Sequence, residues 1–169
     1  MALTTDLEFH HEQSRPNSCV AACICMVRAR LGNKKKEARF HQGASQGGHS
    51  IEHATRFLGG KLEVLGEDDL DVVKSHLMGG GWAIVGVSGP RYVSRVQPIG
   101  HSMHGPMCPP GEWGGPFHAV VATGADAKLL RVLDPYHPKA SQPVRIHNAD
   151  FLYVWNGQIL FVEGPTPAS

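Results

Sequence analysis

The sequence has no segment that resembles a membrane anchor or a cleavable export signal. Its first residues carry neither the cationic stretch nor the apolar core of a signal peptide. Its longest apolar runs, near Ala83–Val87 and Ala119–Ala122, are far too short to cross a bilayer. We therefore expect no membrane insertion, and a protein that is cytoplasmic or is exported as an effector without a cleavable signal peptide.

An excess of either charge is also missing. The chain of 169 residues has 16 Lys and Arg against 15 Asp and Glu, which gives a formal net charge of +1. Proteins that bind nucleic acid through its phosphates need a surplus of basic residues, so we expect no nucleic-acid partner. Nothing in the sequence indicates an oligomeric state.

Cysteine is scarce and poorly placed for disulfides. Of the four cysteines, Cys19, Cys23 and Cys25 fall within seven residues, and only Cys108 lies elsewhere. The first two are one helical turn apart on one face, which does not suit a disulfide framework. In a reducing compartment, clustered thiols are buried small residues, metal ligands or nucleophiles. We expect Cys23 and Cys25 to be core residues.

Glycine and proline, in contrast, are abundant, with 20 Gly and 12 Pro. Such numbers imply many turns, and therefore several strands and irregular loops rather than a helical bundle. The length and the 41% of hydrophobic residues suit one globular domain that needs no disulfide or metal to fold. We expect a single domain over residues 1–169, with an extended lead-in over 1–12 and a polar tail over 164–169.

Helical patterns dominate the first half of the chain. The segment Asn17–Gly32 combines a capping residue, an Ala-rich interior and a terminating glycine, which predicts a mostly buried helix over about Cys19–Leu31. Further helices are expected over about 35–41, 50–58 and 68–78, with a short strand over 61–65.

Short apolar runs dominate the second half. They predict strands over 82–87, 118–123, 129–133, 144–147 and 158–162, and a short helix over 148–154. Helices followed by a largely antiparallel set of strands make an α+β fold.

The interval Ser88–Phe117 follows neither pattern. It is rich in Gly and Pro with little periodicity, so we expect a long loop. It contains His101, His104 and Cys108, residue types that bind zinc. No second cysteine pair accompanies them, so a plain polar loop is the stronger expectation, and we expect no metal and no cofactor. Trp113 either forms a wall of a cleft or anchors the loop.

Cys19 is the central candidate for chemistry. It falls in the first turn of the predicted helix, where unpaired N–H groups and the helix dipole favour an anion. A thiol in such a place ionises more readily, and the thiolate is the nucleophile. The alternative is a small apolar residue at a helix start, which is the commoner role of a buried cysteine.

Two residues further along the chain could activate such a nucleophile. The sulfur needs a base within hydrogen-bond reach, and the base needs an orienting group. His118 begins a predicted strand and Asp134 follows the next strand. In a tight hairpin these ends lie side by side, so Asp134 can bind one imidazole nitrogen while the other faces Cys19. Taken separately, they suit a strand-edge histidine and an Asp-Pro turn; their combination favours catalysis.

Gln13 is a candidate oxyanion donor. It lies six residues before Cys19. Its side-chain amide and the backbone N–H of Cys19 would together stabilise a tetrahedral intermediate.

These motifs occur together in a known superfamily. Gln-x5-Cys at a helix start, a Gly/Pro-rich approach to His-Ala-Val-Val, and a strand ending in Asp-Pro resemble the papain-like cysteine peptidases. Two small bacterial branches are the most similar: the peptidase domains that cleave double-glycine bacteriocin leaders, and the papain-like effector proteases of plant pathogens. The segment Ser18–Met26 resembles the effector branch, and Phe151–Gly157 resembles the end of these domains.

The resemblance implies a cysteine peptidase acting on a protein or peptide substrate. Cys19 would be the nucleophile, on a helical half of the domain. His118 and Asp134, on a twisted antiparallel sheet, would be the general acid/base and its orienting residue, with Gln13 as the oxyanion donor. The loop 88–117 would border the cleft.

Two other functions remain open. The same residues support amidase, deamidase or acyl-transfer chemistry, and a papain-like domain can also persist as a non-catalytic binding module. The intact set of four residues argues against the binding module.

Overall fold

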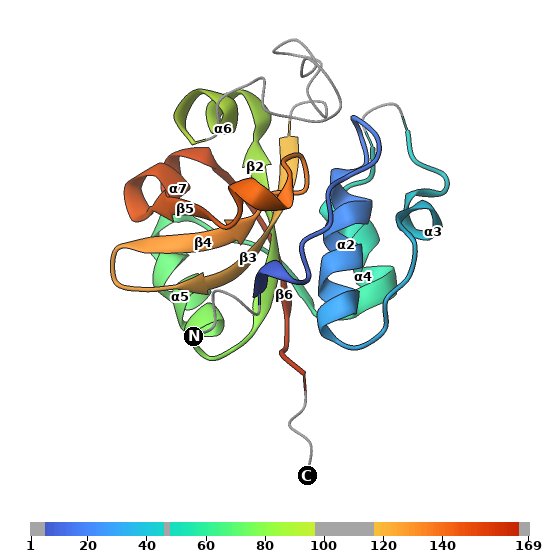
Figure 1. The fold of residues 1–169 in the computed structure, drawn as a ribbon. Coiled ribbons are helices and arrows are strands. Elements are labelled where there is room, and N and C mark those ends of the chain that lie inside the picture. The colour runs from blue at the N-terminus through green and yellow to red at the C-terminus, as the bar shows by residue number, and fades with distance from the viewer. Residues whose placement is uncertain (1–5, 46–47, 97–116, 166–169) are drawn as a thin grey trace.

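The computed structural model describes residues 6–45, 48–96 and 117–165 (Figure 1). Helices come first along the chain and most strands later, so the structure has the α+β fold that the sequence predicts. The helices are α2 (Cys19–Arg30), α3 (Glu37–His41), α4 (Ile51–Leu58), α5 (Leu70–Met78), α6 (Gly89–Arg95) and α7 (Asn148–Val154). The strands are β1 (Lys61–Val64), β2 (Trp82–Ser88), β3 (Phe117–Ala125), β4 (Leu129–Leu133), β5 (Val144–His147) and β6 (Trp155–Val162).

A six-stranded sheet organises the described part of the chain. The strand order is β1-β6-β2-β3-β4-β5, and every neighbouring pair is antiparallel. β2 lies between β6 and β3, and its residues Trp82–Val87 are all buried. The unbroken apolar run of this strand therefore reflects burial on both faces of the sheet.

Helices cover both faces of the sheet. Ala83 and Val85 of β2 belong to a cluster with apolar residues of α5, α6 and α7, whereas Trp82 and Ile84 belong to a second cluster with α2 and α4. This division follows from the two-residue alternation of a strand. Figure 1 shows the same arrangement, with α2 and α4 on one side of the sheet and α5, α6 and α7 on the opposite side.

Helix α2 is buried along most of its length. Each residue of Cys19–Val27 is at most 4% exposed, because α3, α4 and β3 pack around it. A helix enclosed in this way needs apolar residues all round rather than on one stripe, which explains the sequence of small and apolar side chains. In the described ranges, no helix combines the length and the apolarity that a bilayer crossing requires.

The expected extended lead-in over 1–12 is wrong for residues 6–9. They form a helical turn, closed by hydrogen bonds from the Phe9 N–H to the Asp6 carbonyl and from the His10 N–H to the Leu7 carbonyl, both 3.1 Å. Leu7 and Phe9 pack against the cluster that contains α2. The turn places both side chains against that cluster.

The expected loop over 88–117 begins with a helix. α6 starts directly after β2, with Pro90 in its first turn and the Ser88 hydroxyl accepting a hydrogen bond from the Arg91 N–H at 3.4 Å. Serine followed by an early proline is a helix-start signal, which the overall Gly and Pro content of the segment masks. Four residues discussed for this loop lie outside the described residues: His101, His104, Cys108 and Trp113.

Strand β6 is longer than the sequence predicts. It begins at Trp155 rather than at 158, because a bulge in β6, between Trp155 paired with Val87 and Ile159 paired with Val85, adds residues to this strand. Gly157 lies within this extension at a φ of 94°, and a Cβ there would lie 2.9 Å from the Leu65 carbonyl oxygen. Glycine therefore interrupts the apolar pattern without ending the strand.

The sheet centre and the sheet edge should differ in their contribution to stability. Ile84 is completely buried in β2, whereas Val64 on the edge strand β1 is 78% exposed. Ile84→Ala should lower the free energy of unfolding by about 2–5 kcal/mol, because it leaves a cavity. Val64→Ala should change it by less than about 0.5 kcal/mol. Urea denaturation followed by circular dichroism measures both, and similar losses would contradict this placement of the core.

Candidate active site

Cys19 is the first residue of α2 and is 4% exposed. The preceding Ser18 does not cap the helix with its side chain, since its hydroxyl accepts from the Arg15 N–H and donates to the Arg15 carbonyl, each at 3.0 Å. The first turn also contains no acidic residue. The positive end of the helix dipole is therefore not neutralised by a side chain of its own first turn.

His118 and Asp134 lie together, with 2.8 Å between His118 Nε2 and Asp134 Oδ1. The β3–β4 ladder reaches only as far as Val121 opposite Leu133, so both residues lie beyond its end. At position 118, β3 is paired with Val87 of β2 alone. The hairpin thus brings the two side chains together diagonally, past the last paired residues, rather than as direct cross-strand partners.

Cys19 completes a chain of three side chains with this pair. The Cys19 side chain interacts with the His118 ring and favours its charged form, and since Nε2 is bonded to Asp134, Nδ1 is the nitrogen left for the sulfur. Burial alone would lower the pKa of His118, but the charge and hydrogen bond of Asp134, helped by Cys19, raise it to about 9. The ring is therefore an imidazolium at neutral pH.

Asp134 is completely buried, and several donors surround its carboxylate. Oδ1 accepts from His118 and from the Tyr136 N–H at 2.9 Å, while Oδ2 accepts from the Tyr92 hydroxyl at 2.9 Å. The His137 ring lies 3.8 Å from Oδ2. Burial by itself would raise the pKa of Asp134, but the two imidazoles and the Tyr136 N–H outweigh burial and lower it. The carboxylate stays ionised.

Tyr92 is a contact that the sequence did not reveal. It is fully buried on α6, and burial together with the charge of Asp134 raises its pKa well above the usual value, so its hydroxyl remains a donor. Its only sequence signal is an aromatic residue in a segment rich in Gly and Pro. Without α6 and its packing on the sheet, that signal does not point to Asp134.

Gln13 is near the site, but its amide is turned towards its own loop. The Gln13 backbone N–H donates to the Pro135 carbonyl at 2.7 Å, one residue after Asp134. Its side-chain Nε2 donates to the carbonyls of Arg15 at 2.7 Å and Pro16 at 3.2 Å. The Oε1 atom is buried and has no hydrogen-bond partner among the residues that the structure describes. The structure thus places Gln13 beside the sheet part of the site, with its N–H groups already in use.

The other described cysteines differ from Cys19. Cys23 and Cys25 are buried on α2 and unpaired as disulfides. Burial raises the pKa of Cys23 well above its usual value and that of Cys25 to about 12. Neither has an imidazole among the causes of its shift, so both are thiols at neutral pH, as core residues are expected to be.

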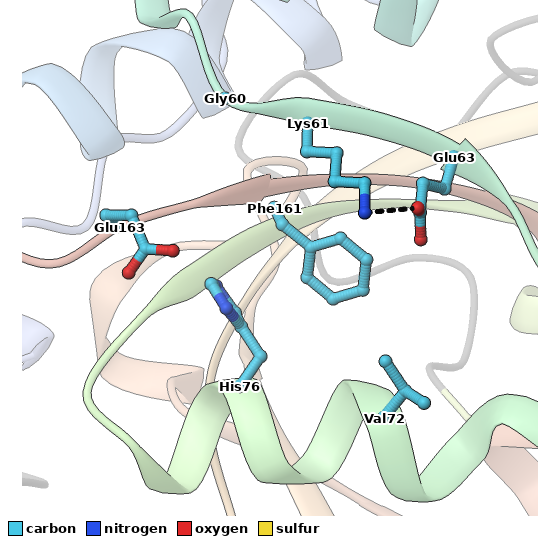
Figure 2. A pocket seen from close by; sticks show the side chains of 7 residues that line it. All are labelled: Gly60, Lys61, Glu63, Val72, His76, Phe161 and Glu163. Carbon is cyan, nitrogen blue, oxygen red and sulfur yellow. Dashed lines mark ion pairs between the residues drawn. The ribbon is translucent and has the colours of Figure 1, made fainter.

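A pocket of about 380 Å³ lies elsewhere, between α5 and the strands β1 and β6 (Figure 2). Lys61 Nζ and Glu63 Oε1 form an ion pair at 2.9 Å on its rim, and the His76 ring packs edge-to-face on Phe161. No Cys, Ser or Thr lines this pocket, so it contains no counterpart of the Cys19–His118 pair. Among the described residues, no group of three or more His, Cys, Asp or Glu side chains is arranged to hold a metal ion.

No family model matches this chain, and no curated protein sequence matches it. Solved structures do match. The peptidase domain of Streptococcus ComA, described as a bi-functional ABC transporter involved in quorum sensing, aligns with a TM-score of 0.57 at 15% identity, over 91% of this chain and 97% of that one. A putative C39-like peptidase from Bacillus anthracis aligns with a TM-score of 0.61 at 12% identity, over 94% and 95%.

A third match is a double glycine motif protease from an AMS/PCAT transporter, solved in complex with its leader peptide. It aligns with a TM-score of 0.57 at 19% identity, over 92% of this chain and 89% of that one. Likeness at this level of identity establishes the fold. The chain has the fold of the C39-like domains, which are papain-like cysteine peptidases, as the sequence motifs predict.

The raised pKa of His118 should appear as a pH dependence of stability. The folded ring titrates at about 9 and an unfolded histidine at about 6.5. Proton uptake on folding therefore stabilises the protein fully below about pH 6.5, and this stabilisation is lost as the pH rises through 9. Asp134→Asn removes the main cause of the raised His118 pKa. The free energy of unfolding should therefore decline less between pH 6.5 and 9 in this variant than in the wild type.

Urea denaturation at several pH values gives the free energy of unfolding of the wild type and of Asp134→Asn. The raised pKa values of Cys23 and Cys25 destabilise the folded state at alkaline pH in either protein, so the comparison rests on the difference between the two curves. Parallel curves from pH 6.5 to 8 would contradict the assigned coupling of His118 to Asp134.

Proposed function

We propose that this protein is a cysteine peptidase that hydrolyses peptide bonds of a protein or peptide substrate, with Cys19, His118 and Asp134 as its catalytic triad. The observation that carries the proposal is the position of His118. One nitrogen is bonded to a buried carboxylate, and a cysteine at the start of a helix interacts with the ring and favours its charged form. That arrangement lies on a fold shared with solved cysteine peptidases.

The geometry supports a two-step reaction. The Cys19 thiolate attacks the substrate carbonyl carbon to form a tetrahedral intermediate, and the His118 imidazolium then gives its Nδ1 proton to the leaving amine as the C–N bond breaks. The neutral imidazole next takes a proton from water, which attacks the thioester. Collapse of the second intermediate breaks the C–S bond and releases the carboxylic acid, with the thiolate and imidazolium restored.

Asp134 acts in this proposal by holding the ring. Its Oδ1 accepts from Nε2, which fixes the ring with Nδ1 towards the sulfur, and its negative charge stabilises the imidazolium. Tyr92 occupies Oδ2, so the carboxylate presents one defined oxygen to the imidazole.

The backbone N–H of Cys19 and the side chain of Gln13 are the proposed oxyanion donors. The helix start makes the Cys19 N–H available for this role. Gln13 donates its weaker bond, at 3.2 Å, to the Pro16 carbonyl. Exchange of this bond for one to the developing oxyanion would bring the Gln13 amide into the reaction and would favour the transition state over the ground state.

A peptide substrate is supported by the solved neighbour that holds a leader peptide. We extend that substrate class to this chain, acting in the cytoplasm or as an exported effector. Amidase, deamidase or acyl-transfer chemistry uses the same three side chains and forms the same thioester. Mass spectrometry of a treated proteome separates them: new chain termini indicate a peptidase, and deamidated glutamines a deamidase.

The pairing of Cys19 with His118 predicts unusual thiol reactivity. In a Cys108→Ser variant, iodoacetamide should alkylate Cys19 well below pH 8, because the imidazolium stabilises the thiolate. His118→Ala should abolish this low-pH reaction. Cys23 and Cys25 should stay unlabelled, since burial raises their pKa values. Fragmentation mass spectrometry identifies the labelled residue. Labelling of Cys19 only above pH 8, unchanged by His118→Ala, would favour the non-catalytic binding module.

The three triad residues should differ in their effect on hydrolysis. Cys19→Ala should abolish cleavage of a proteome-derived peptide mixture with little change in stability, because the change in volume is small. His118→Ala should remove nearly all activity, whereas Asp134→Asn, which keeps the shape of an orienting group, should cost about tenfold less than His118→Ala. Mass spectrometry measures the rate of peptide cleavage by each of the three variants. Equal losses at His118 and Asp134 would contradict the orienting role.

A further inference from the structure

A buried carboxylate outside the triad binds the segment that leads into Cys19. Glu37, at the start of α3, is 7% exposed. Its Oε1 lies 2.9 Å from His11 Nε2, and it accepts from the Ser14 N–H at 3.0 Å. Its Oε2 accepts from the Ser14 hydroxyl, and Ser18 is among the groups that lower its pKa. All these donors belong to residues 11–18.

This segment joins the two halves of the candidate site. It carries Gln13, ends at Cys19, and in Figure 1 runs between α2 and the sheet. The hydrogen bond from the Gln13 N–H to the Pro135 carbonyl fixes it to the sheet, and Glu37 fixes it to the helical part. Ser14, which follows Gln13, makes the contacts with Glu37. Two neighbouring residues are therefore held from opposite sides, Gln13 by the sheet and Ser14 by the helical part.

Glu37 is suited to hold a fixed geometry rather than to fill space. Burial of a carboxylate is unfavourable unless donors surround it, and an apolar side chain would pack here without that cost. Burial alone would raise the pKa of Glu37, but the hydrogen bonds from His11 and Ser14, with a smaller contribution from Ser18, outweigh burial and lower it. The carboxylate is therefore ionised and holds its donors at set positions.

We propose that Glu37 is a positioning residue for the oxyanion hole: it fixes the segment 13–18 so that the Gln13 amide and the Cys19 N–H face the same substrate carbonyl. This inference rests on the proposed peptidase function. It assigns Glu37 to stabilisation of the oxyanion and not to activation of the sulfur, since the His118–Asp134 pair that activates Cys19 is held by other residues.

Two small probes separate these roles. Iodoacetamide reacts with the Cys19 thiolate by displacement of iodide at a saturated carbon, so no oxyanion forms. With p-nitrophenyl acetate, the thiolate attacks the ester carbonyl, the oxygen becomes negative, and p-nitrophenolate leaves as the thioester forms. A variant with a disordered oxyanion hole therefore loses the second reaction and keeps the first.

Glu37→Gln keeps the shape of the side chain but replaces one acceptor oxygen with an NH2 that faces donors. In the Cys108→Ser background, it should slow acylation by p-nitrophenyl acetate by about 10- to 100-fold, somewhat less than the loss of an oxyanion donor itself. Alkylation of Cys19 by iodoacetamide should stay within about twofold of the parent. Glu37→Asp, which keeps the charge on a shorter side chain, should recover part of the acylation rate.

Gln13→Ala provides the matched comparison. It should show the same loss of acylation with retained alkylation. The double variant Gln13→Ala/Glu37→Gln should acylate little more slowly than Gln13→Ala, because both changes remove the same stabilisation of the oxyanion. Glu63→Gln, a carboxylate on β1 paired with Lys61, should leave both rates unchanged. Additive losses in the double variant would overturn the proposal.

Other outcomes are also decisive. An unchanged acylation rate in Glu37→Gln, or an equal loss of acylation and alkylation, would show that Glu37 only supports the fold. If circular dichroism shows that Glu37→Gln does not fold, Ser14→Ala takes its place. It removes one donor to Glu37 and should slow acylation to a smaller extent, with alkylation retained. Failure of the peptidase function looks different: the parent protein itself would then show no low-pH alkylation of Cys19 and no cleavage of peptides.

Discussion

The bond between His118 and Asp134 is the interaction on which the candidate site depends. Both side chains are removed from water, where an unpaired charge would be strongly unfavourable. They are ionised because each is the counter-ion of the other, and the Tyr92 hydroxyl and the Tyr136 N–H supply further bonds to the carboxylate. The same pairing that makes burial tolerable keeps a proton on the ring beside Cys19.

Local signals were sufficient to predict most of the fold and three positions of the site. A capping segment and an Ala-rich run place the start of α2 at Cys19, and two apolar runs separated by a turn place His118 and Asp134 at adjacent strand ends. Each of these inferences needs only residues close in sequence, because helix starts, strand ends and tight turns are determined locally.

Contacts between distant segments were not predictable in this way. Tyr92 reaches Asp134 only because a helix follows β2, where composition suggested a loop. Glu37 lies in the helix expected over 35–41, directly after three lysines, and its contacts become visible only when residues 11–18 are folded against it. The position of Gln13 was predictable, but the direction of its amide is set by carbonyls within its own turn.

The site is built where the two packed halves of the molecule meet, so its geometry depends on how α2 lies against the sheet. Ala119, directly after His118, belongs to the same apolar cluster as Cys19, and small side chains there allow the helix close to β3. The positions of Cys19, His118 and Asp134 are therefore fixed by packing on one face of β3 and by hydrogen bonds around Asp134. Residues 11–18, bound to Pro135 and to Glu37, connect the same two halves at the level of Cys19. A substitution that loosens the packing of α2 against β3 would separate the Cys19 sulfur from the His118 imidazole, even if it touched neither residue.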